Sequence, residues 1–158
     1  THCISSAASD VYKRQIFGLS LVHTKADLFH AFQEAVCYAL RHSMESTGRD
    51  LGDYIVIAGG VTNSPDWVQM FADVTGYAVR TPVDDAEANL GDVMLAGLAT
   101  DTLTVDEVQK WQVLGDKVEP RAEQHATYND YYKLYRKLYD DLGDDMHTLS
   151  LISGIEES

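Results

Sequence analysis

The amino-acid sequence predicts an α/β fold in which a short parallel sheet is covered by helices. Three observations support this prediction: an apolar run over 54–58, stretches of helical periodicity on both sides of it, and clear signals where the helices start and stop. Helices that alternate with strands favour right-handed crossovers. Because only two strands are predicted, we expect either a homodimer through an open sheet edge or further strands from sequence upstream of this chain.

The first predicted helix begins after Thr24 and extends to about Glu45. Asp27 follows Thr24 by three residues, which is the spacing of a capping box, and apolar residues then recur with a period of 3.6. Cys37 lies in the middle of this helix. We interpret it as a buried, inert thiol rather than a nucleophile, because no neighbouring group would lower its pKa.

The first strand, over 54–58, is a continuous apolar run, which predicts burial on both of its faces. It leads directly into Gly59 and Gly60, where the absence of side chains would let a ligand touch the main chain. The helix that follows points unpaired N–H groups at the same place. This arrangement is typical of nucleotide sites, but a tight turn that needs a positive φ would use the same glycines.

The second helix has unusually clear limits. Ser64 is the expected N-cap, Pro65 takes the first helical position, and Gly76 lies just past the end. Large apolar side chains recur along one face and are expected to form its inner stripe: Trp67, Met70, Phe71 and Val74.

A second strand over 77–80 and a third helix over 86–99 complete the predicted α/β unit. Alanine and glycine in that helix would let it lie close to a sheet. Asp84 and Asp85 stand where carboxylates favour a helix start. A paired acid–base role is less favoured, because adjacent positions on a helix do not face each other.

A polar connector over 101–119 is followed by a last predicted helix over 122–142. Its apolar side chains are mostly aromatic: Tyr128, Tyr131, Tyr132, Leu134, Tyr135, Leu138 and Tyr139. We interpret the rings as packing residues rather than a stacking platform for single-stranded nucleic acid, because the chain is acidic. Residues 143–158 are expected to be an acidic, frayed tail, and 1–15 a flexible or non-native lead.

Composition limits the classes of function. The 158 residues suit one domain, and an apolar content of 45% is enough for a packed core. Asp plus Glu number 25 and Lys plus Arg 12, which gives a formal charge of −13. Such a surface repels nucleic acids and anionic membranes, so neither is an expected partner. It also repels phosphates, so a nucleotide site would need local N–H donors and a divalent cation.

The cysteines and histidines indicate no metal site. Cys3 and Cys37 form neither a disulfide framework nor a metal-binding pair, which is typical of a reducing compartment, and we expect a cytoplasmic protein. The 6 histidines lack the spacing of metal ligands. No apolar run approaches the roughly 20 residues that a membrane helix needs.

Several segments together resemble the C-terminal actin-like domain of the FGGY carbohydrate kinases. The resemblance is densest over 58–76, where the sequence is similar to the family pattern GG-x-x-x-S-x-x-W-x-Q-x-x-A-D-x-x-G. Other similar segments lie at 18–28, 34–41, 87–91 and 128–139, so that the resemblance covers about 16–142. It implies part of an actin-like, ribonuclease H-like ATPase domain. One departure is Asp92, beside Asn89, where relatives usually carry a small residue; it fits a surface position or marks a subfamily.

The resemblance implies an ATP-dependent kinase that phosphorylates a hydroxyl of a small sugar, with ATP and Mg²⁺ as cofactors. Xylulokinase-like enzymes, which act on a pentulose, look nearest. The implied nucleotide-binding residues are Gly59, Gly60, Val61, Asn63 and Ser64. The family's phosphate-cradling motif and general-base Asp belong to sequence upstream of these residues. No catalytic residue is therefore assigned to this chain, and an N-terminal kinase domain is an expected partner together with ATP and the sugar.

Two other interpretations are compatible with the sequence. The chain could be a non-catalytic nucleotide-binding or interaction module of the actin and chaperone superfamily. It could also be a fragment with no independent function, which does not conflict with a kinase origin. In either case we expect these 158 residues alone to be inactive as a kinase and to self-associate. The gene sequence upstream would distinguish a kinase from a module.

Overall fold

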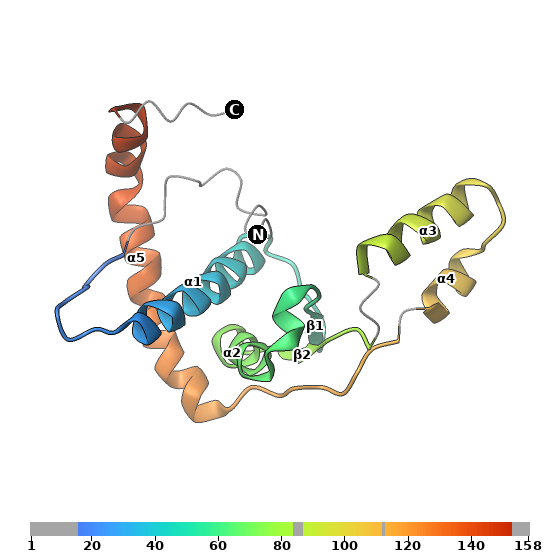
Figure 1. Ribbon diagram of the computed structural model, residues 1–158, viewed down its shortest axis with the longest axis horizontal. Coiled ribbons are helices and arrows are strands. Elements are labelled where there is room, and N and C mark those ends of the chain that lie inside the picture. The colour runs from blue at the N-terminus through green and yellow to red at the C-terminus, as the bar shows by residue number, and fades with distance from the viewer. Residues whose placement is uncertain (1–15, 84–86, 112, 153–158) are drawn as a thin grey trace. The chain divides into compact units, whose positions relative to one another are not determined.

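The computed structural model describes residues 16–83, 87–111 and 113–152 (Figure 1). Three sequence predictions fall outside these residues: the lead over 1–15, the helix start at Asp84 and Asp85, and the last part of the tail.

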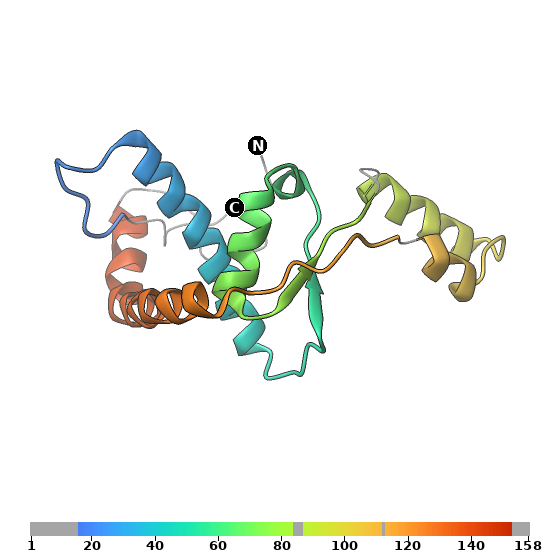
Figure 2. The same cartoon turned by 90° about the horizontal axis from the view of Figure 1, so that it is seen from below.

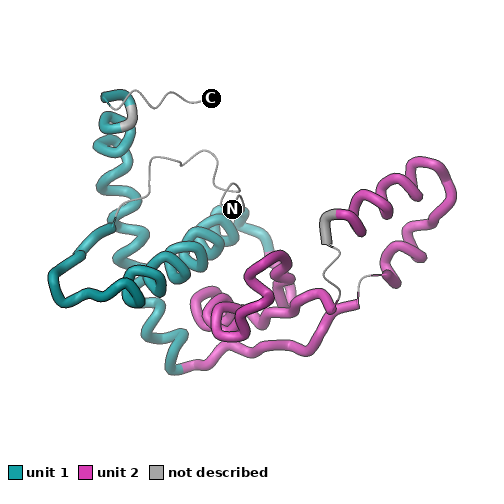
Figure 3. Tube along the Cα trace, viewed as in Figure 1, with its two compact units in different colours: residues 1–49, 123–158 teal, residues 50–122 magenta. Residues whose placement is uncertain are grey.

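The chain divides into two compact units, which are coloured separately in Figure 3. Unit 1 combines Thr1–Arg49 with Glu123–Ser158, and unit 2 is the continuous segment Asp50–Ala122. Segments far apart in the sequence thus share unit 1, whereas unit 2 folds from neighbouring sequence.

Unit 1 is built around two long helices, α1 (Lys25–Ser46) and α5 (Ala122–Ile152). The predicted capping box at the start of α1 is confirmed: the Thr24 hydroxyl accepts a hydrogen bond from the Asp27 N–H, and the Thr24 N–H donates to the Asp27 carboxylate at 2.7 Å. Cys37 is fully buried, as expected.

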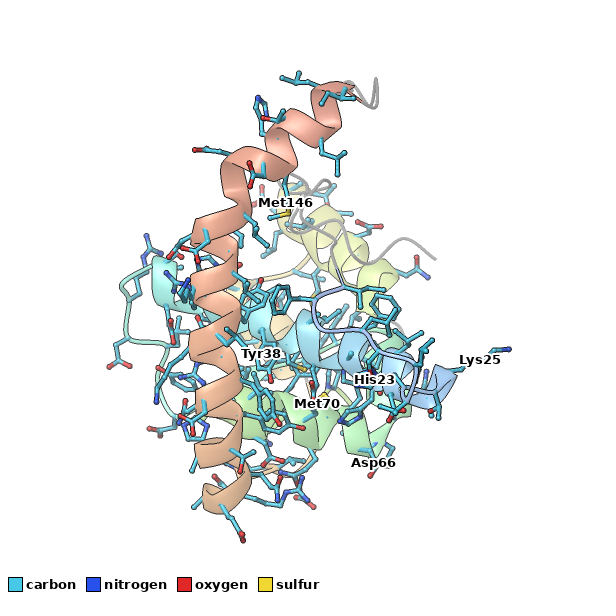
Figure 4. All side chains as sticks on the ribbon, turned by 90° about the vertical axis from the view of Figure 1, so that its left-hand side faces the viewer. His23, Lys25, Tyr38, Asp66, Met70 and Met146 are labelled. Carbon is cyan, nitrogen blue, oxygen red and sulfur yellow. The ribbon has the colours of Figure 1, made fainter. Side chains whose placement is uncertain are left out.

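The α5 helix is longer than the sequence predicts. We expected a frayed tail from residue 143, but the helix continues to Ile152. Met146 is 4% exposed, so the extension carries a buried apolar side chain between its acidic residues (Figure 4). Charge composition alone gave the wrong boundary, because it does not show that the Met146 side chain is buried when the chain folds.

Aromatic rings join α1 to α5. The ring of Tyr38, on α1, lies 5.5–6.3 Å from the rings of Tyr128, Tyr132 and Tyr135 on α5, measured between centroids. Tyr38 and Tyr132 are buried. The interpretation as packing residues is therefore confirmed for Tyr128, Tyr132 and Tyr135, whereas it was wrong for Tyr131 and Leu134, whose side chains are 60% and 48% exposed. Burial raises the pKa of Tyr38, so its hydroxyl stays protonated.

A polar network lies beside these rings and centres on Glu45, near the end of α1. The Tyr132 hydroxyl donates to Glu45 Oε2 at 2.7 Å, and Arg41 Nε donates to Glu45 Oε1 at 3.0 Å. The Arg41 guanidinium also lies over the Tyr132 ring, 4.1 Å from its centroid. Partial burial acts to raise the pKa of Glu45, but the hydrogen bonds from Tyr132 and Arg41 outweigh it and lower that pKa.

Unit 2 contains the sheet, in the order β1 (Tyr54–Val56), η2 (Gly60–Asn63), α2 (Pro65–Thr75) and β2 (Ala78–Arg80). The strands are parallel and adjacent, with Ile55 opposite Val79, and α2 packs against β2 (Figures 1 and 2). The predicted α/β class with a short parallel sheet is confirmed.

The first strand differs from its prediction in two respects. It ends at Val56 rather than at residue 58, and Val56 is 41% exposed rather than buried on both faces. In contrast, Ala78 and Val79 of β2 are buried. The reason is position: among the described residues β1 pairs only with β2 and forms the edge of the sheet, whereas β2 has neighbours on both sides.

The segment predicted as a polar connector is more ordered than expected. It contains a short helix, α4 (Val105–Trp111), and then a stretch that runs antiparallel to β2, as Figure 2 shows. Val79 and Val118 exchange two main-chain hydrogen bonds of 2.9 and 2.8 Å, and Leu114 bridges Pro82. The prediction was wrong because an open strand edge needs hydrogen-bond partners, and residues far along the chain supply them.

Arg80 compensates for an irregularity in this pairing. Two residues lie between the two bridges on one side, Arg80 at the end of β2 and Thr81 after it, whereas three residues, 115–117, lie on the other side. The second segment thus has one extra residue, as in a β-bulge. The Arg80 guanidinium donates to the carbonyls of Gly115 and Leu114 at 2.8 and 2.9 Å. These two hydrogen bonds give a donor to main-chain oxygens for which the irregular pairing supplies no N–H group.

The third helix, α3 (Glu87–Ala99), is joined to α4 by a tight connection. A side chain at Gly97 would collide with Leu103, which packs on this glycine. In the described structure this small residue thus accommodates the following loop rather than a sheet. Asn89 and Asp92 are exposed, which fits their surface interpretation. Among the described residues, no helix has the length and apolarity to cross a membrane.

Candidate functional site

The candidate site is the turn between β1 and α2. Its first residue, Gly59, has φ 96° and ψ −172°, a backbone conformation that essentially only glycine adopts. The main chain is still tied to the sheet just before it, because the Ile57 N–H donates to the Arg80 carbonyl at 3.0 Å. The turn therefore leaves the end of the first strand in a fixed direction.

The second glycine leaves space beside the main chain. Gly60 is exposed, and a Cβ built on it would meet no atom of the chain within 4 Å. It begins the short helix η2, whose first N–H groups have no acceptor within the helix. The N–H groups of Gly60 and Val61 likewise find no acceptor among the residues that the structure describes. The start of η2 thus has two hydrogen-bond donors without acceptors among the described residues, next to a glycine that leaves room for a ligand.

The short helix is held by its own first turn. The Gly59 carbonyl accepts two hydrogen bonds from Thr62, one from its N–H and one from its hydroxyl, both 2.9 Å long. The Ser64 N–H donates to the Val61 carbonyl at 3.0 Å and closes the next turn. Asn63 is exposed between them.

Ser64 caps the second helix as predicted. Its hydroxyl accepts the Trp67 N–H at 3.4 Å, and its carbonyl accepts the N–H groups of Trp67 and Val68 at 3.0 Å. The start of α2 therefore lies at the candidate site, with the positive end of its dipole. Asp66 in the first turn puts a negative charge at the same end (Figure 4). An anionic ligand here would benefit from a cation that offsets this charge.

The five predicted residues are contiguous, so the chain itself brings them together. The structure confirms the Ser64 cap and assigns the positive φ to Gly59. It places Gly60 and Asn63 on the exposed side and leaves Val61 half-buried. Their part in nucleotide binding stays a prediction.

Sequence reasoning missed a second feature of this unit, a buried carboxylate. Asp73 is fully buried, although it belongs to the helix that carries the apolar stripe. Arg121 donates three hydrogen bonds to it: from its N–H at 2.7 Å, from Nε at 3.0 Å and from Nη2 at 2.5 Å. Gln69 donates to Asp73 at 3.0 Å and also to the Glu119 carbonyl at 3.0 Å.

This network, which we name the Asp73 clamp, consists of Asp73, Gln69, Arg121 and the Glu119 carbonyl. A carboxylate so deeply buried requires charged or N–H partners, because desolvation penalises an unpaired charge. An aspartate inside an apolar stripe could have signalled that a cation lies elsewhere in the chain. The sequence alone does not say which of the 12 basic residues it is.

The described residues bring together no group of three or more side chains that could hold a metal ion. The donor set of the turn, main-chain N–H groups and one hydroxyl, suits phosphate oxygens rather than a cation.

Comparison with known proteins identifies the class. Residues 6–100 match the model of the C-terminal domain of the FGGY family of carbohydrate kinases. This match covers more than half of the chain and includes the candidate site and two of the four members of the Asp73 clamp, Gln69 and Asp73. The chain belongs to the FGGY family of carbohydrate kinases and carries sequence of its C-terminal domain.

Individual relatives support the same assignment. A probable L-xylulose kinase of Pasteurella multocida is 31% identical over 114 residues, which are 71% of this chain and 23% of that protein. Glycerol kinase 3 of Streptomyces avermitilis is 38% identical over 88 residues, which are 54% of this chain and 17% of that protein. The chain thus spans about a quarter of the length of such relatives, or less.

Solved structures agree in fold. A xylulose kinase from Rhodospirillum rubrum has a TM-score of 0.66 at 29% identity, over 82% of this chain and 27% of that one. A ligand-bound xylulose kinase from Lactobacillus acidophilus has a TM-score of 0.73 at 19% identity, over 85% of this chain and 28% of that one. The second likeness concerns the fold alone. Together they confirm an FGGY-type actin-like fold, of which this chain forms a part.

Proposed function

We propose that this chain is the ATP-binding part of a sugar kinase that transfers the γ-phosphoryl group of ATP to a hydroxyl of a small sugar. The acceptor would be a pentulose such as xylulose. Membership of a carbohydrate kinase family supports the general reaction, and relatives with xylulose in their names support the choice of sugar. A cytoplasmic location and a homodimer are parts of the same proposal and rest on cysteine usage and the exposed edge of β1.

The observation that carries the proposal is the geometry of the glycine turn. Gly60 is open to solvent, two N–H groups lack acceptors among the described residues, and the start of α2 follows at once. These donors can bind phosphate oxygens without a side chain in the way. Such a surface would hold the nucleotide while the sugar is brought to it.

In this reaction the chain's own contribution would be positioning. Phosphoryl transfer depends mainly on alignment and on neutralising charge, and both need a fixed phosphate. The described residues near the turn include Asp66, whose carboxylate repels phosphate, so Mg²⁺ bound with ATP would supply the missing positive charge. The base that accepts the sugar's proton is assigned to no residue of this chain, and these residues alone should show little kinase activity.

The direct test is a substrate panel with the full-length gene product that contains these residues. Xylulose, L-xylulose, gluconate and glycerol would be offered with ATP and Mg²⁺, and ADP release would be followed. We expect turnover that depends on sugar and is highest with a pentulose. Nucleotide binding without phosphoryl transfer to any sugar would instead favour a non-catalytic module. Robust sugar-dependent ATP turnover by the 158 residues alone would contradict the proposal that this chain binds ATP but supplies no general base.

Gly60→Val tests the site itself. A Cβ at this position meets no atom of the chain within 4 Å, so we expect the fold to be retained, but the branched side chain would occupy the space proposed for the nucleotide. We expect the KM for ATP to rise strongly and the KM for the sugar to stay the same. Gly143→Val is a matched control, because that glycine also has open space around its Cβ and lies on α5. An unchanged KM for ATP in Gly60→Val would remove Gly60 from the site.

A further inference from the structure

The carbonyl of Gly59 is the most firmly held group in the glycine turn. Thr62 donates to it twice, from its N–H and from its hydroxyl Oγ1, and both distances are 2.9 Å. The N–H bond belongs to the ordinary first turn of η2 and would form with any residue except proline. The hydroxyl bond is specific to Thr62, which is half-buried and had no role in the sequence-based prediction of the site.

Holding this carbonyl determines where the next N–H points. The Gly59 carbonyl and the Gly60 N–H belong to one peptide unit, and the described chain has no cis peptide bond. In a trans peptide these two groups point in opposite directions. Since the carbonyl points into the first turn of η2, the Gly60 N–H points the opposite way, out of the N-terminal end of η2, where it has no acceptor among the described residues.

The turn needs such a restraint because glycine is flexible. Gly59, at φ 96° and ψ −172°, and Gly60 beside it lack the side chains that restrict backbone rotation in other residues. Without a second bond to the carbonyl, the peptide between them can rotate and point its N–H elsewhere. A ligand would then have to order the peptide when it binds, which weakens the affinity.

We infer that Thr62 is a positioning residue of the proposed nucleotide site: its hydroxyl fixes the Gly59 carbonyl, and thereby aims the Gly60 N–H at a phosphate of the bound nucleotide. The inference rests on the proposed function. It adds a residue that touches no ligand itself and acts through the peptide between the two glycines. The chemistry needed at this position is a hydroxyl on a side chain short enough to reach back three residues.

Three substitutions in the full-length gene product separate positioning from a merely structural role. Thr62→Val keeps the shape of the side chain and removes the hydroxyl, whereas Thr62→Ser keeps the hydroxyl. Thr127→Val is the control, because its hydroxyl also bonds a main-chain carbonyl, that of Glu123 at 3.2 Å, but on α5. The readouts are the KM for ATP, the KM for the sugar, kcat and the thermal midpoint of each variant.

We expect Thr62→Val to raise the KM for ATP about fivefold to tenfold, as the loss of one hydrogen bond would. Its KM for the sugar and its thermal midpoint should match those of the unaltered protein, and Thr62→Ser should restore the KM for ATP. Thr127→Val should change none of these. An unaltered KM for ATP in Thr62→Val would overturn the role of Thr62.

Two other results would also be decisive. If Thr62→Val lowers the thermal midpoint and raises both KM values together, or if Thr62→Ser behaves like Thr62→Val, the hydroxyl serves the fold rather than the nucleotide, and the inference is wrong. If the unaltered protein shows no saturable dependence on ATP, the proposed function fails, and the role of Thr62 fails with it. The unaltered protein therefore distinguishes the two failures.

Discussion

Different kinds of contact stabilise the inside of each of the two units. In unit 1, side chains join the helices: tilted and edge-on tyrosine rings, and a network around Glu45, a residue that lies at the surface. In unit 2, main-chain bonds join β1, β2 and the segment that returns along β2, and the fully buried Asp73 fastens the end of that segment. The densest family pattern falls in unit 2.

This difference explains what the pattern residues do. In unit 2 the backbone needs a defined conformation, because the proposed ligand contacts are main-chain N–H groups. Gly59 and Ser64 shape the turn, whereas Gln69 and Asp73 hold the far end of α2 to the residues around Arg121. Some residues of the pattern thus stabilise the fold around the turn and contact other residues of the chain rather than a ligand. In unit 1 a ring can be replaced by another ring at a modest cost.

The largest effect that would sharpen this comparison is expected from Arg121→Ala. The Arg121 side chain is itself 61% exposed, but it donates two hydrogen bonds to the buried carboxylate of Asp73, and leaving a buried charged group short of partners costs about 3 kcal/mol. Urea unfolding followed by tryptophan fluorescence measures it, since Trp67 and Trp111 both lie in unit 2. Arg49→Ala, at an exposed arginine, is the control. Equal midpoints for the two variants would show that the Asp73 clamp is not essential.

Gly59→Ala should come next. A side chain at φ 96° and ψ −172° is strained, and such conformations cost about 2 kcal/mol for residues other than glycine. Gly60→Ala should have little effect, because its Cβ would point into open space. The same tryptophan signal compares the two variants. Equal losses of stability would mean that the turn relaxes and that its conformation is not fixed by Gly59.

A smaller pair of opposite effects is expected in unit 1. Tyr132→Phe removes the hydroxyl that donates to Glu45 at 2.7 Å and should cost about 1 kcal/mol. Tyr38→Phe removes a buried hydroxyl that has no hydrogen-bond partner among the described residues, and should be neutral or stabilise by up to about 1 kcal/mol.

Near-ultraviolet circular dichroism of the tyrosines, most of which lie in unit 1, follows this unfolding. If Tyr38→Phe destabilised the protein more than Tyr132→Phe, the buried hydroxyl would have to have a partner after all.

The smallest expected effect is a pH dependence of unit 1. The pKa of Glu45 is lowered in the folded state, so its contribution to stability is present above the ordinary value of 4.5 and is lost as the pH falls through the folded pKa. Burial raises the pKa of Glu34, so that group contributes in the opposite direction and favours folding at lower pH.

Glu45→Gln should therefore make unfolding less dependent on pH below 4.5, whereas Glu34→Gln should make the loss of stability on acidification steeper. Chemical unfolding at several pH values on both sides of 4.5 provides the measurement. Identical pH profiles for both variants would show that neither carboxylate couples folding to protonation.

Local signals predicted much of this fold. The capping box at Thr24, the N-cap at Ser64 and the left-handed Gly76 are all confirmed, because caps and turns involve residues within one helical turn. The errors occurred where distant segments meet. The antiparallel partner of β2, the exposure of Val56 and the continuation of α5 all depend on pairing or packing that periodicity does not reveal.

The candidate site follows the same division. Its residues are contiguous, so the sequence alone specified a glycine turn leading into a capped helix and identified the family. The two bonds from Thr62 to the Gly59 carbonyl are as local as a helix cap, but the sequence pattern does not show the backbone angles that direct them. Only the tertiary structure decided the pairing of Asp73 with Arg121, which lies 48 residues further along the chain. The physical reason is range: sequence patterns report neighbours along the chain, whereas the partner of a buried charge is a group that folding brings near.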